Sequence, residues 1–492
     1  MNAKQDTLLD HDNPLLEAIG AYVPYEHWPG ILERDPLEGI DFGALDEERK
    51  DVYIELTHKR FAATPTAVEI ASALQTMIRT SYALRNPTLP EQRRRLASIA
   101  ANRGRSATTL ALGAPLVYGK LISGITGLGK SVMVERALSQ LPEVCVHDKC
   151  EAAGWIRHVQ IPVVAVQMLS SRGGLLYAIL DSLDRIAGTN YRQDYAKRSA
   201  WTVEKLFVEV AALLALHSVG LLIVEEIQVR TFALSPFREE LLLFFLRLLN
   251  YGIPVVLIGN PLGFAQLDDF SQDVRRLTRS DPIELMPAPS VTDEDWDEGI
   301  APAIWEYGTT TGCVSYQEVR ADLWRHAGGI PDFAATIGSG TLRLAYRHGV
   351  RSLEHFRRFI AESPRLKKNR DLIDGFAARD PLKLSRYLDV PWEDYAQRWG
   401  CDLGDIVAMG RHAGTASLAE LPDEDATACL SLHARLRARY QRELTAKKSR
   451  AERNAAARAK AGPGDLRGAT DVSKHLARGI DQLKEELETE AA

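Results

Sequence analysis

Hydrophobic positions recur at helical spacing in some stretches of the chain and form short continuous runs in others. Helical spacing marks residues 1–110, where prolines stand at the loops between helices. It is clearest at residues 67–84. From residue 115 onward, short apolar runs alternate with helical segments. Strands are predicted at residues 115–122, 161–168, 220–227 and 253–258, and helices at residues 175–187, 202–217 and 241–249.

Apolar strands separated by helices indicate a parallel sheet with helices on both faces, which is an α/β fold of the αβα sandwich type. Helical spacing returns around Gly328-Gly329-Ile330-Pro331, and an Arg/Lys/Ala-rich run follows at residues 435–460. We therefore expect a helical N-terminal region (1–110), an α/β core (111–287), a helical lid (288–350) and a helical C-terminal extension (351–492).

A glycine-rich loop follows the first predicted strand. Residues 124–131, GITGLGKS, fit the pattern GxxxxGK(S/T), and they stand between a strand and a helix as a P-loop requires. Glycines let successive N–H groups point at phosphate oxygens, and the helix dipole attracts the same charge. The alternative is a glycine-rich turn with an incidental lysine. The predicted nucleotide-binding residues are Gly124, Ile125, Thr126, Gly127, Leu128, Gly129, Lys130, Ser131 and Val132.

An acidic pair, Glu225-Glu226, ends the strand predicted at residues 220–227. Carboxylates at the carboxyl end of a strand beside a P-loop form the second half of an NTPase site. Lys130 would contact the β- and γ-phosphates of ATP, Ser131 and Glu225 would hold Mg²⁺, and Glu226 would orient the attacking water. A solvated strand edge is the alternative.

Polar residues after the next strand extend this predicted site. Asn260 would hydrogen-bond the water or the γ-phosphate, although an Asn-Pro pair after a strand is often only a turn. Arg275, Arg276 and Arg279 follow, and ring NTPases often supply such an arginine across a subunit boundary to stabilise the transferred phosphoryl group. A solvated basic helix explains these arginines as well.

The bulk composition is that of a soluble globular protein of several domains, with 492 residues, 45% hydrophobic and 26% charged. The net charge of −6 argues against a uniformly basic nucleic-acid-binding surface but leaves room for local basic patches. The start of the chain lacks the pattern of a signal peptide, and polar residues interrupt the longest apolar region. We expect a cytoplasmic protein without a membrane span.

Cys145, His147 and Cys150, with His158 as a fourth ligand, raise the question of a zinc site. Their spacing matches no standard zinc finger, and the chain has no second CxxC pair. We therefore expect a strand and loop here without zinc. The 5 cysteines form no disulfide framework in so long a chain, which indicates a reducing compartment.

Together these residues resemble the TnsC/TniB/MuB group of AAA+ ATPases, which regulate DNA transposition, and TnsC-like proteins most closely. The family's P-loop, G-x-S-G-x-G-K-S, stands here as GITGLGKS. Its acidic-strand motif, roughly LLVIDEIQ, stands as LLIVEEIQ, with Gln228 retained and Glu225 in place of the aspartate. Further matches are NPLLEAI, MIRTSYALRNP, GTNYRQDY, IPVVLIGNP and GGIPD, which follow in order over residues 13–350.

The resemblance implies a bacterial, ATP-dependent, DNA-binding regulator. Its subunits would assemble with ATP and Mg²⁺ into a ring or helical filament on duplex DNA of any sequence. They would present that DNA to a transposase, work with a target-selection protein, and separate on hydrolysis. Glu225 is one methylene longer than aspartate, so hydrolysis could be slow, and the family's arginine-rich segment stands here as VRRLTR, which keeps Arg275 and Arg279.

Two other functions fit the residues. A replication initiator or helicase loader of the AAA+ type would share the core but lack the N-terminal and GTNYR matches. A signalling NTPase sensor would oligomerise through its C-terminal region without touching DNA. Weak candidates for DNA contacts are Arg172, Arg192, Lys197 and Arg198, which a solvated surface explains equally well, as it does the cluster of arginines at residues 93–95.

The end of the chain carries one apolar stripe. Leu476, Ile480, Leu483 and Leu487 share a face of a short charged helix that follows a Gly- and Pro-containing break. A helix this short needs a surface to lie on, so we expect residues 465–492 to dock on the transposase or a target-selection protein, or else on their own body. The basic run at residues 435–460 would hold DNA phosphates or serve as a solvated face.

Overall fold

The structure is a computed structural model. It describes residues 12–101, 103, 117–197, 202–264, 267, 276–277, 281–310 and 312–401. All of these lie in one compact unit, residues 1–426. The basic run at residues 435–460 and the apolar stripe of residues 465–492 lie outside the described residues.

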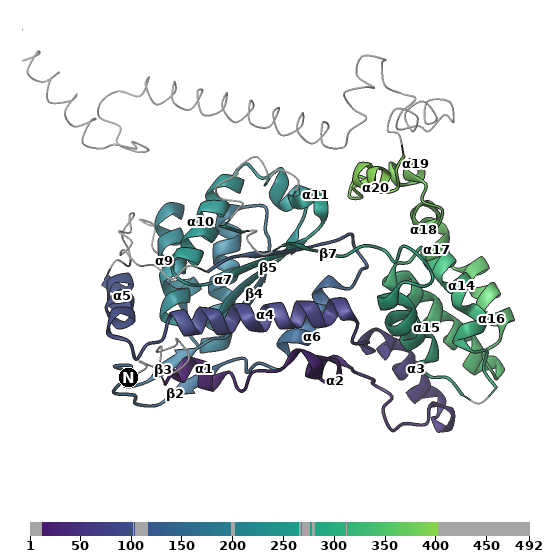
Figure 1. Ribbon diagram of the computed structural model, residues 1–492, viewed down its shortest axis with the longest axis horizontal. Helices are drawn as coiled ribbons and strands as arrows, with labels where there is room; N and C mark the ends of the chain where they lie inside the picture. Colours follow the sequence, from purple (N-terminus) through teal and green to yellow (C-terminus); the bar gives the residue numbers. More distant parts are fainter. Residues whose placement is uncertain are drawn as a thin grey trace, which may run out of the picture. The chain divides into compact units, whose positions relative to one another are not determined.

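Five strands of the described chain form one parallel sheet, in the order β4-β5-β6-β1-β7 (Figure 1). Their bounds are β1 Lys120–Ser123, β4 Val163–Gln167, β5 Leu221–Ile227, β6 Val255–Gly259 and β7 Ile283–Glu284. Strands β4 and β6 start one residue after Pro162 and Pro254, because proline has no N–H to give to the ladder. The predicted parallel sheet is confirmed.

Alternate residues of β5 face opposite sides of the sheet, as the period of two in a strand requires. Leu221 and Ile223 pack in one core cluster with helices α4 and α6, whereas Leu222 and Val224 pack in a second cluster with α7, α9 and α10. These helices span α4 Pro65–Leu84, α6 Lys130–Leu138, α7 Arg172–Ala187, α9 Val203–Leu216 and α10 Arg238–Asn250. Figure 1 shows α4 running along the first face, so the predicted αβα sandwich is confirmed.

The N-terminal helices pack on both the core and the lid. Helices α1 (Pro14–Ala18) and α2 (Trp28–Leu32) share the α4 cluster, and α3 (Glu47–Glu55) contacts the lid helix α15 (Pro331–His348). The hydroxyl of Tyr307 donates a hydrogen bond to the carbonyl of Tyr53, 2.8 Å away. The other described N-terminal elements are α5 Pro90–Ala101, η1 Tyr25–His27, η2 Phe42–Ala44 and η3 Leu56–Lys59.

The lid and the segment after it are helical, as the spacing predicts. Their described elements are η6 Asp295–Ile300, α13 Ala301–Glu306, α14 Tyr316–Ala327, α15, α16 Leu353–Glu362, α17 Pro364–Lys368, α18 Arg370–Ala377, α19 Pro381–Leu384 and α20 Trp392–Arg398. Trp392 and Tyr395 of α20 are buried in the same cluster as the lid helices. The described part of the C-terminal extension is therefore packed on the rest of this unit.

Several short elements connect the layers. Strands β2 (Cys145–His147) and β3 (His158–Gln160) form an antiparallel hairpin between α6 and β4. The turn η4 (Val229–Ala233) follows β5, α8 (Tyr191–Ala196) follows α7, and α11 (Pro261–Phe264) follows β6. Within the described ranges, no helix has the length and apolar character needed to cross a membrane.

Candidate functional site

The glycine-rich loop joins β1 to α6 and touches the lid. Gly127 and Gly129 have φ angles of 92° and 87°, in the left-handed region that favours glycine. The N–H of Asp332, at the start of α15, donates to the carbonyl of Gly127 over 3.1 Å. A Cβ added to Gly127 would lie 3.0 Å from the Cβ of Asp332. The GGIPD segment of the lid therefore packs directly on this loop.

Lys130 is held by the loop itself. Its Nζ donates to the carbonyls of Gly124 and Ile125, at 2.7 and 2.8 Å. Burial lowers the pKa of Lys130 to about 8, although Glu226 and Glu225 act in the opposite direction. A neutral carbonyl is a weaker partner for an ammonium group than a charged phosphate oxygen. Lys130 is therefore placed where a phosphate group would replace the two carbonyls as its partner.

Ser131 and Glu225 bring the helix after the loop to the acidic strand. The Ser131 hydroxyl donates to Oε2 of Glu225 at 3.2 Å. Burial raises the pKa of Glu225, and the hydrogen bond from Ser131 opposes that rise. A hydroxyl and a carboxylate oxygen this close are the hard oxygen ligands that Mg²⁺ prefers, so this pair fits the predicted metal-binding role.

Glu226 is exposed and has an unusual backbone. Its φ angle is +59°, whereas residues with a side chain rarely adopt positive φ. The Gln228 Nε2 donates to Oε2 of Glu226, and the Thr231 hydroxyl donates to the Glu226 carbonyl at 2.7 Å. The two neighbouring acids thus differ: Glu225 bonds to the P-loop helix, and Glu226 bonds to the turn that follows β5.

Asn260 lies directly after β6, as predicted, but both ends of its side-chain amide have partners. Its Nδ2 donates to the carbonyl of Asp389 at 2.6 Å, and its Oδ1 accepts from the N–H of Leu262 at 3.0 Å. Asp389 belongs to the segment before α20, and no sequence pattern pointed to it. Contact with a phosphate or water, the predicted role of Asn260, would use the second Nδ2 hydrogen or replace the bond to Asp389.

Most of the predicted functional arginines lie outside the described residues. Arg275, Arg279 and Arg198 lie outside the described residues, and so does the side chain of Arg172, although α7 begins there. Arg276, between the two predicted trans-acting arginines, donates to Oδ1 of Asn250.

The two described DNA-contact candidates have different surroundings. Arg192 forms an ion pair with Asp181, so an acid of the same chain already offsets its charge. Lys197 is exposed at the end of α8. Of these two, Lys197 has the side chain more available to a phosphate.

The two histidines of the β2–β3 hairpin, His147 and His158, each hydrogen-bond to a side chain of the protein. His147 Nε2 lies 2.7 Å from Oε1 of Gln160, and the ring of His158 stacks on Trp155 with centroids 4.1 Å apart. Burial lowers the pKa of His158 to about 4. Among the residues that the structure describes, no group of three His, Cys, Asp or Glu side chains is placed to hold a metal ion.

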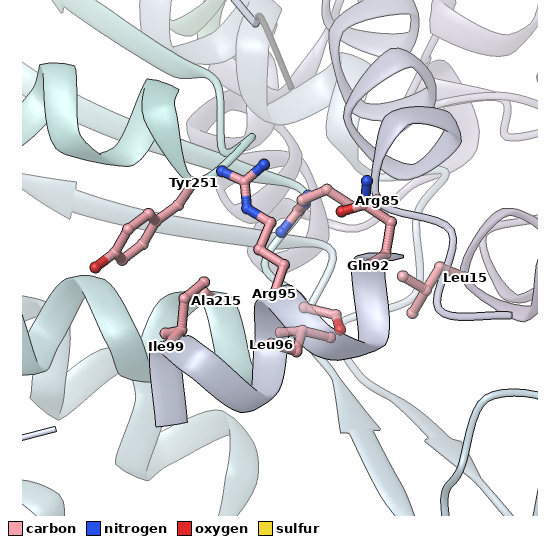
Figure 2. Close-up of a pocket in the computed structure, with 9 residues that line it drawn as sticks. Leu15, Arg85, Gln92, Arg95, Leu96, Ile99, Ala215 and Tyr251 are labelled. Atoms are coloured by element: carbon pink, nitrogen blue, oxygen red, sulfur yellow. The ribbon is translucent and has the colours of Figure 1, made fainter. Parts of the chain in front are cut away.

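A small cavity lies between α5 and the start of the sheet, and Figure 2 shows Arg85 and Arg95 among the residues that line it. The Arg85 Nη2 donates to the Ser81 hydroxyl and to the Val219 carbonyl, each at 2.6 Å, and Arg95 donates to the Asn250 carbonyl. Burial lowers the pKa of Arg85 to about 10. The volume of about 20 Å³ holds roughly one water, which is too small for a larger ligand. The two arginines therefore connect neighbouring layers of the fold through their hydrogen bonds.

One family model and two solved structures show what this chain is similar to. Residues 120–267 match a family model described as an AAA domain. The solved structure of the ORC1 protein of Aeropyrum pernix in complex with DNA is 18% identical, covers 70% of this chain and 85% of its own, and has a TM-score of 0.34. The ORC2 protein of the same organism, in ADPNP-ADP complexes, is 14% identical with coverages of 56% and 68% and a TM-score of 0.33.

No curated protein matches the sequence. The family match covers β1, the P-loop, β5 and β6, which are the elements that carry the predicted site. The described chain therefore has a P-loop AAA+ fold, with a five-stranded parallel sheet and helical N-terminal and C-terminal regions.

Proposed function

We propose that this protein is an ATP-driven switch that assembles on duplex DNA and regulates DNA transposition. The observation that carries the ATPase part is the hydrogen bond between Ser131 and Glu225, beside Lys130. It joins the P-loop helix to the acidic strand, so a lysine, a hydroxyl and a carboxylate converge at one end of the sheet. These are the groups that phosphoryl transfer needs.

In this proposal, Lys130 exchanges its two carbonyl partners for phosphate oxygens, and Ser131 and Glu225 hold Mg²⁺. Glu226 orients a water whose oxygen bonds to the γ-phosphorus while the bond to ADP breaks, and the proton that the water loses passes to solvent. ATP and water thus become ADP and phosphate. Asn260 contacts the γ-phosphate after leaving Asp389, and Arg275 or Arg279 reaches the site of a neighbouring subunit.

The contact between the lid and the P-loop supports a switch. The Asp332 N–H bonds to the Gly127 carbonyl, and the Asn260 amide bonds to the Asp389 carbonyl. Both the lid and the segment before α20 are thus attached to residues that would touch the nucleotide. A γ-phosphate that rearranges these bonds would change the surfaces that a subunit offers to its neighbours in a ring or filament.

DNA binding and transposition rest on the resemblance in sequence over residues 13–350. The matching segments include ones far from the P-loop, such as GTNYRQDY, which runs from the residue after α7 into α8. An unrelated P-loop protein would have no reason to share these segments. A transposase and a target-selection protein are the proposed partners.

Deleting residues 465–492 should weaken recruitment of a transposase and leave ATP turnover unchanged. Lost turnover would instead mean that these residues pack on their own protein.

The test of DNA binding compares nucleotide states. Purified protein is titrated onto several unrelated labelled duplexes with a non-hydrolysable ATP analogue, with ADP, or without nucleotide, across a salt series. We expect tight binding only with the ATP analogue, equal on all duplexes, and strongly weakened by salt because bound phosphates release counterions. Binding to one preferred sequence would favour a replication initiator. No binding in any state would favour a signalling NTPase.

A further inference from the structure

The strand that carries the acidic pair is irregular where Glu226 stands. Val224 of β5 pairs with Leu257 of β6, and Ile227 then pairs with Gly259, so three steps along β5 match two along β6. This extra residue is a β-bulge, a device that turns side chains near functional sites. Glu226 lies inside the bulge with a φ of +59°. A backbone this unfavourable for glutamate persists only where its surroundings hold it.

Two glycines leave room for the bulge. A Cβ on Gly259 would lie 2.0 Å from the carbonyl oxygen of Ile227, and a Cβ on Gly263 would lie 2.6 Å from the same atom. That carbonyl accepts a hydrogen bond from the N–H of Asn260 at 2.8 Å. The end of β5 therefore lies so close to β6 and α11 that no side chain would fit at positions 259 and 263.

Thr231 holds the backbone of Glu226, and Gln228 holds its carboxylate. The Thr231 hydroxyl donates to the Glu226 carbonyl at 2.7 Å and accepts from the Gln228 N–H at 3.0 Å. The side chain of Gln228 in turn accepts from the backbone N–H of Thr231. Since the side-chain oxygen of Gln228 is used in that bond, its Nε2 is directed to Oε2 of Glu226.

We infer that Gln228 and Thr231 are positioning residues for Glu226, an inference that rests on the proposed ATPase function. Gln228 occupies one oxygen of the carboxylate and leaves the other to orient the attacking water. The Thr231 hydroxyl holds the left-handed backbone of Glu226, and the Thr231 backbone N–H orients the Gln228 amide. An exposed glutamate without these bonds would sample several rotamers, and misplacement of a catalytic group by about 1 Å costs up to roughly 100-fold in rate.

Two matched pairs of variants test this. Thr231→Val keeps the shape of threonine and removes the hydroxyl, whereas Thr231→Ser keeps the hydroxyl. Gln228→Met keeps the length of glutamine and removes the amide, whereas Gln228→Glu keeps an acceptor but replaces the donor that faces Glu226. We expect kcat to fall about 10-fold in Thr231→Val, Gln228→Met and Gln228→Glu, and to stay within about twofold of wild type in Thr231→Ser. Affinity for a fluorescent ATP analogue should stay unchanged in all four.

A second measurement places the effect on Glu226. Single-turnover hydrolysis by Glu226→Gln is compared with that of Glu226→Gln combined with Thr231→Val. We expect no further loss in the double variant, because the group that Thr231 positions is already gone. An equal 10-fold loss in both backgrounds would overturn the inference, as would wild-type kcat in Thr231→Val and Gln228→Met. If wild-type protein itself does not hydrolyse ATP above the level of Lys130→Ala, the proposed function fails and the inference fails with it.

Discussion

The Ser131 hydroxyl and the Glu225 carboxylate lie 3.2 Å apart, although 94 positions separate them in the sequence. This contact links the P-loop helix α6 to the acidic strand β5. It also explains how the longer side chain at position 225 is accommodated. The glutamate reaches the serine directly, so the two proposed oxygen ligands lie together without the aspartate of the family that the sequence resembles.

Glu225→Asp tests the fit of that longer side chain. We expect turnover to be preserved or raised, because an aspartate restores the family's residue at the proposed Mg²⁺ site. Steady-state hydrolysis at several Mg²⁺ concentrations measures this, with Glu225→Gln as the control that should lose activity and need more Mg²⁺. A large loss of turnover in Glu225→Asp would mean that the site has adapted to the methylene.

ATP binding should take up protons near pH 8. The pKa of Lys130 is lowered from 10.5 to about 8 in the protein without nucleotide, and a bound phosphate favours the ammonium form. The favourable charge is therefore fully present below pH 8, and affinity falls as the pH rises through about 8.

Calorimetry in buffers of different ionisation enthalpy at pH 8 should show uptake of roughly half a proton per ATP bound. Glu226→Gln removes a carboxylate that raises the Lys130 pKa, so its uptake should begin at lower pH. Affinity that is constant from pH 7 to 10 would contradict this account of Lys130.

Arg85→Met should lower stability without affecting the nucleotide site. The substitution leaves the Val219 carbonyl without its guanidinium donor, and an unsatisfied buried group costs about 1–3 kcal/mol. Chemical unfolding measures the change, and Arg94→Met on the exposed face of α5 is the matched control, expected within about 0.5 kcal/mol of wild type. If Arg85→Met weakened ATP binding at unchanged stability, the arginine would have a role beyond joining the layers.

Nucleotide should loosen the segment before α20. If Asn260 leaves the Asp389 carbonyl to contact a phosphate, hydrogen exchange should speed up at the N–H groups of Val390 and Trp392, which bond within this segment. Asn260→Ala should show the faster exchange without nucleotide. Exchange that slows on addition of an ATP analogue would mean that Asn260 keeps Asp389 in the bound state.

The sequence is informative where one residue type and its neighbours determine the local structure. The apolar runs of β5 and β6 predict buried strands because such residues are stable only where helices cover both faces. GITGLGKS predicts the loop because glycine adopts positive φ values, as at Gly127 and Gly129, far more readily than other residues. These features depend on short-range chemistry. The parallel sheet and its helical layers follow from them.

Other features depend on contacts between distant residues and leave no local signal. The bond from Asn260 to Asp389 spans 129 positions, and nothing near Asp389 suggests a partner in the core. A glutamate in a sequence does not indicate positive φ, so nothing at Glu226 predicts the bulge. Gly259 and Gly263 make room for it, but their role is clear only once the strands are paired. The arginines at residues 93–95 fit a solvated face or a phosphate contact equally well, yet Arg95 donates to the Asn250 carbonyl.

The central claim is that ATP in this site drives assembly on DNA and that hydrolysis reverses it. The most direct measurement follows the DNA-bound mass of Glu226→Gln and Lys130→Ala by sedimentation with random duplex and ATP. Glu226→Gln should bind ATP, form large complexes on DNA and keep them for hours, because only the water-orienting carboxylate is lost. Lys130→Ala should form none at any ATP concentration. Equal assembly by both variants, or assembly that ATP does not change, would contradict the account.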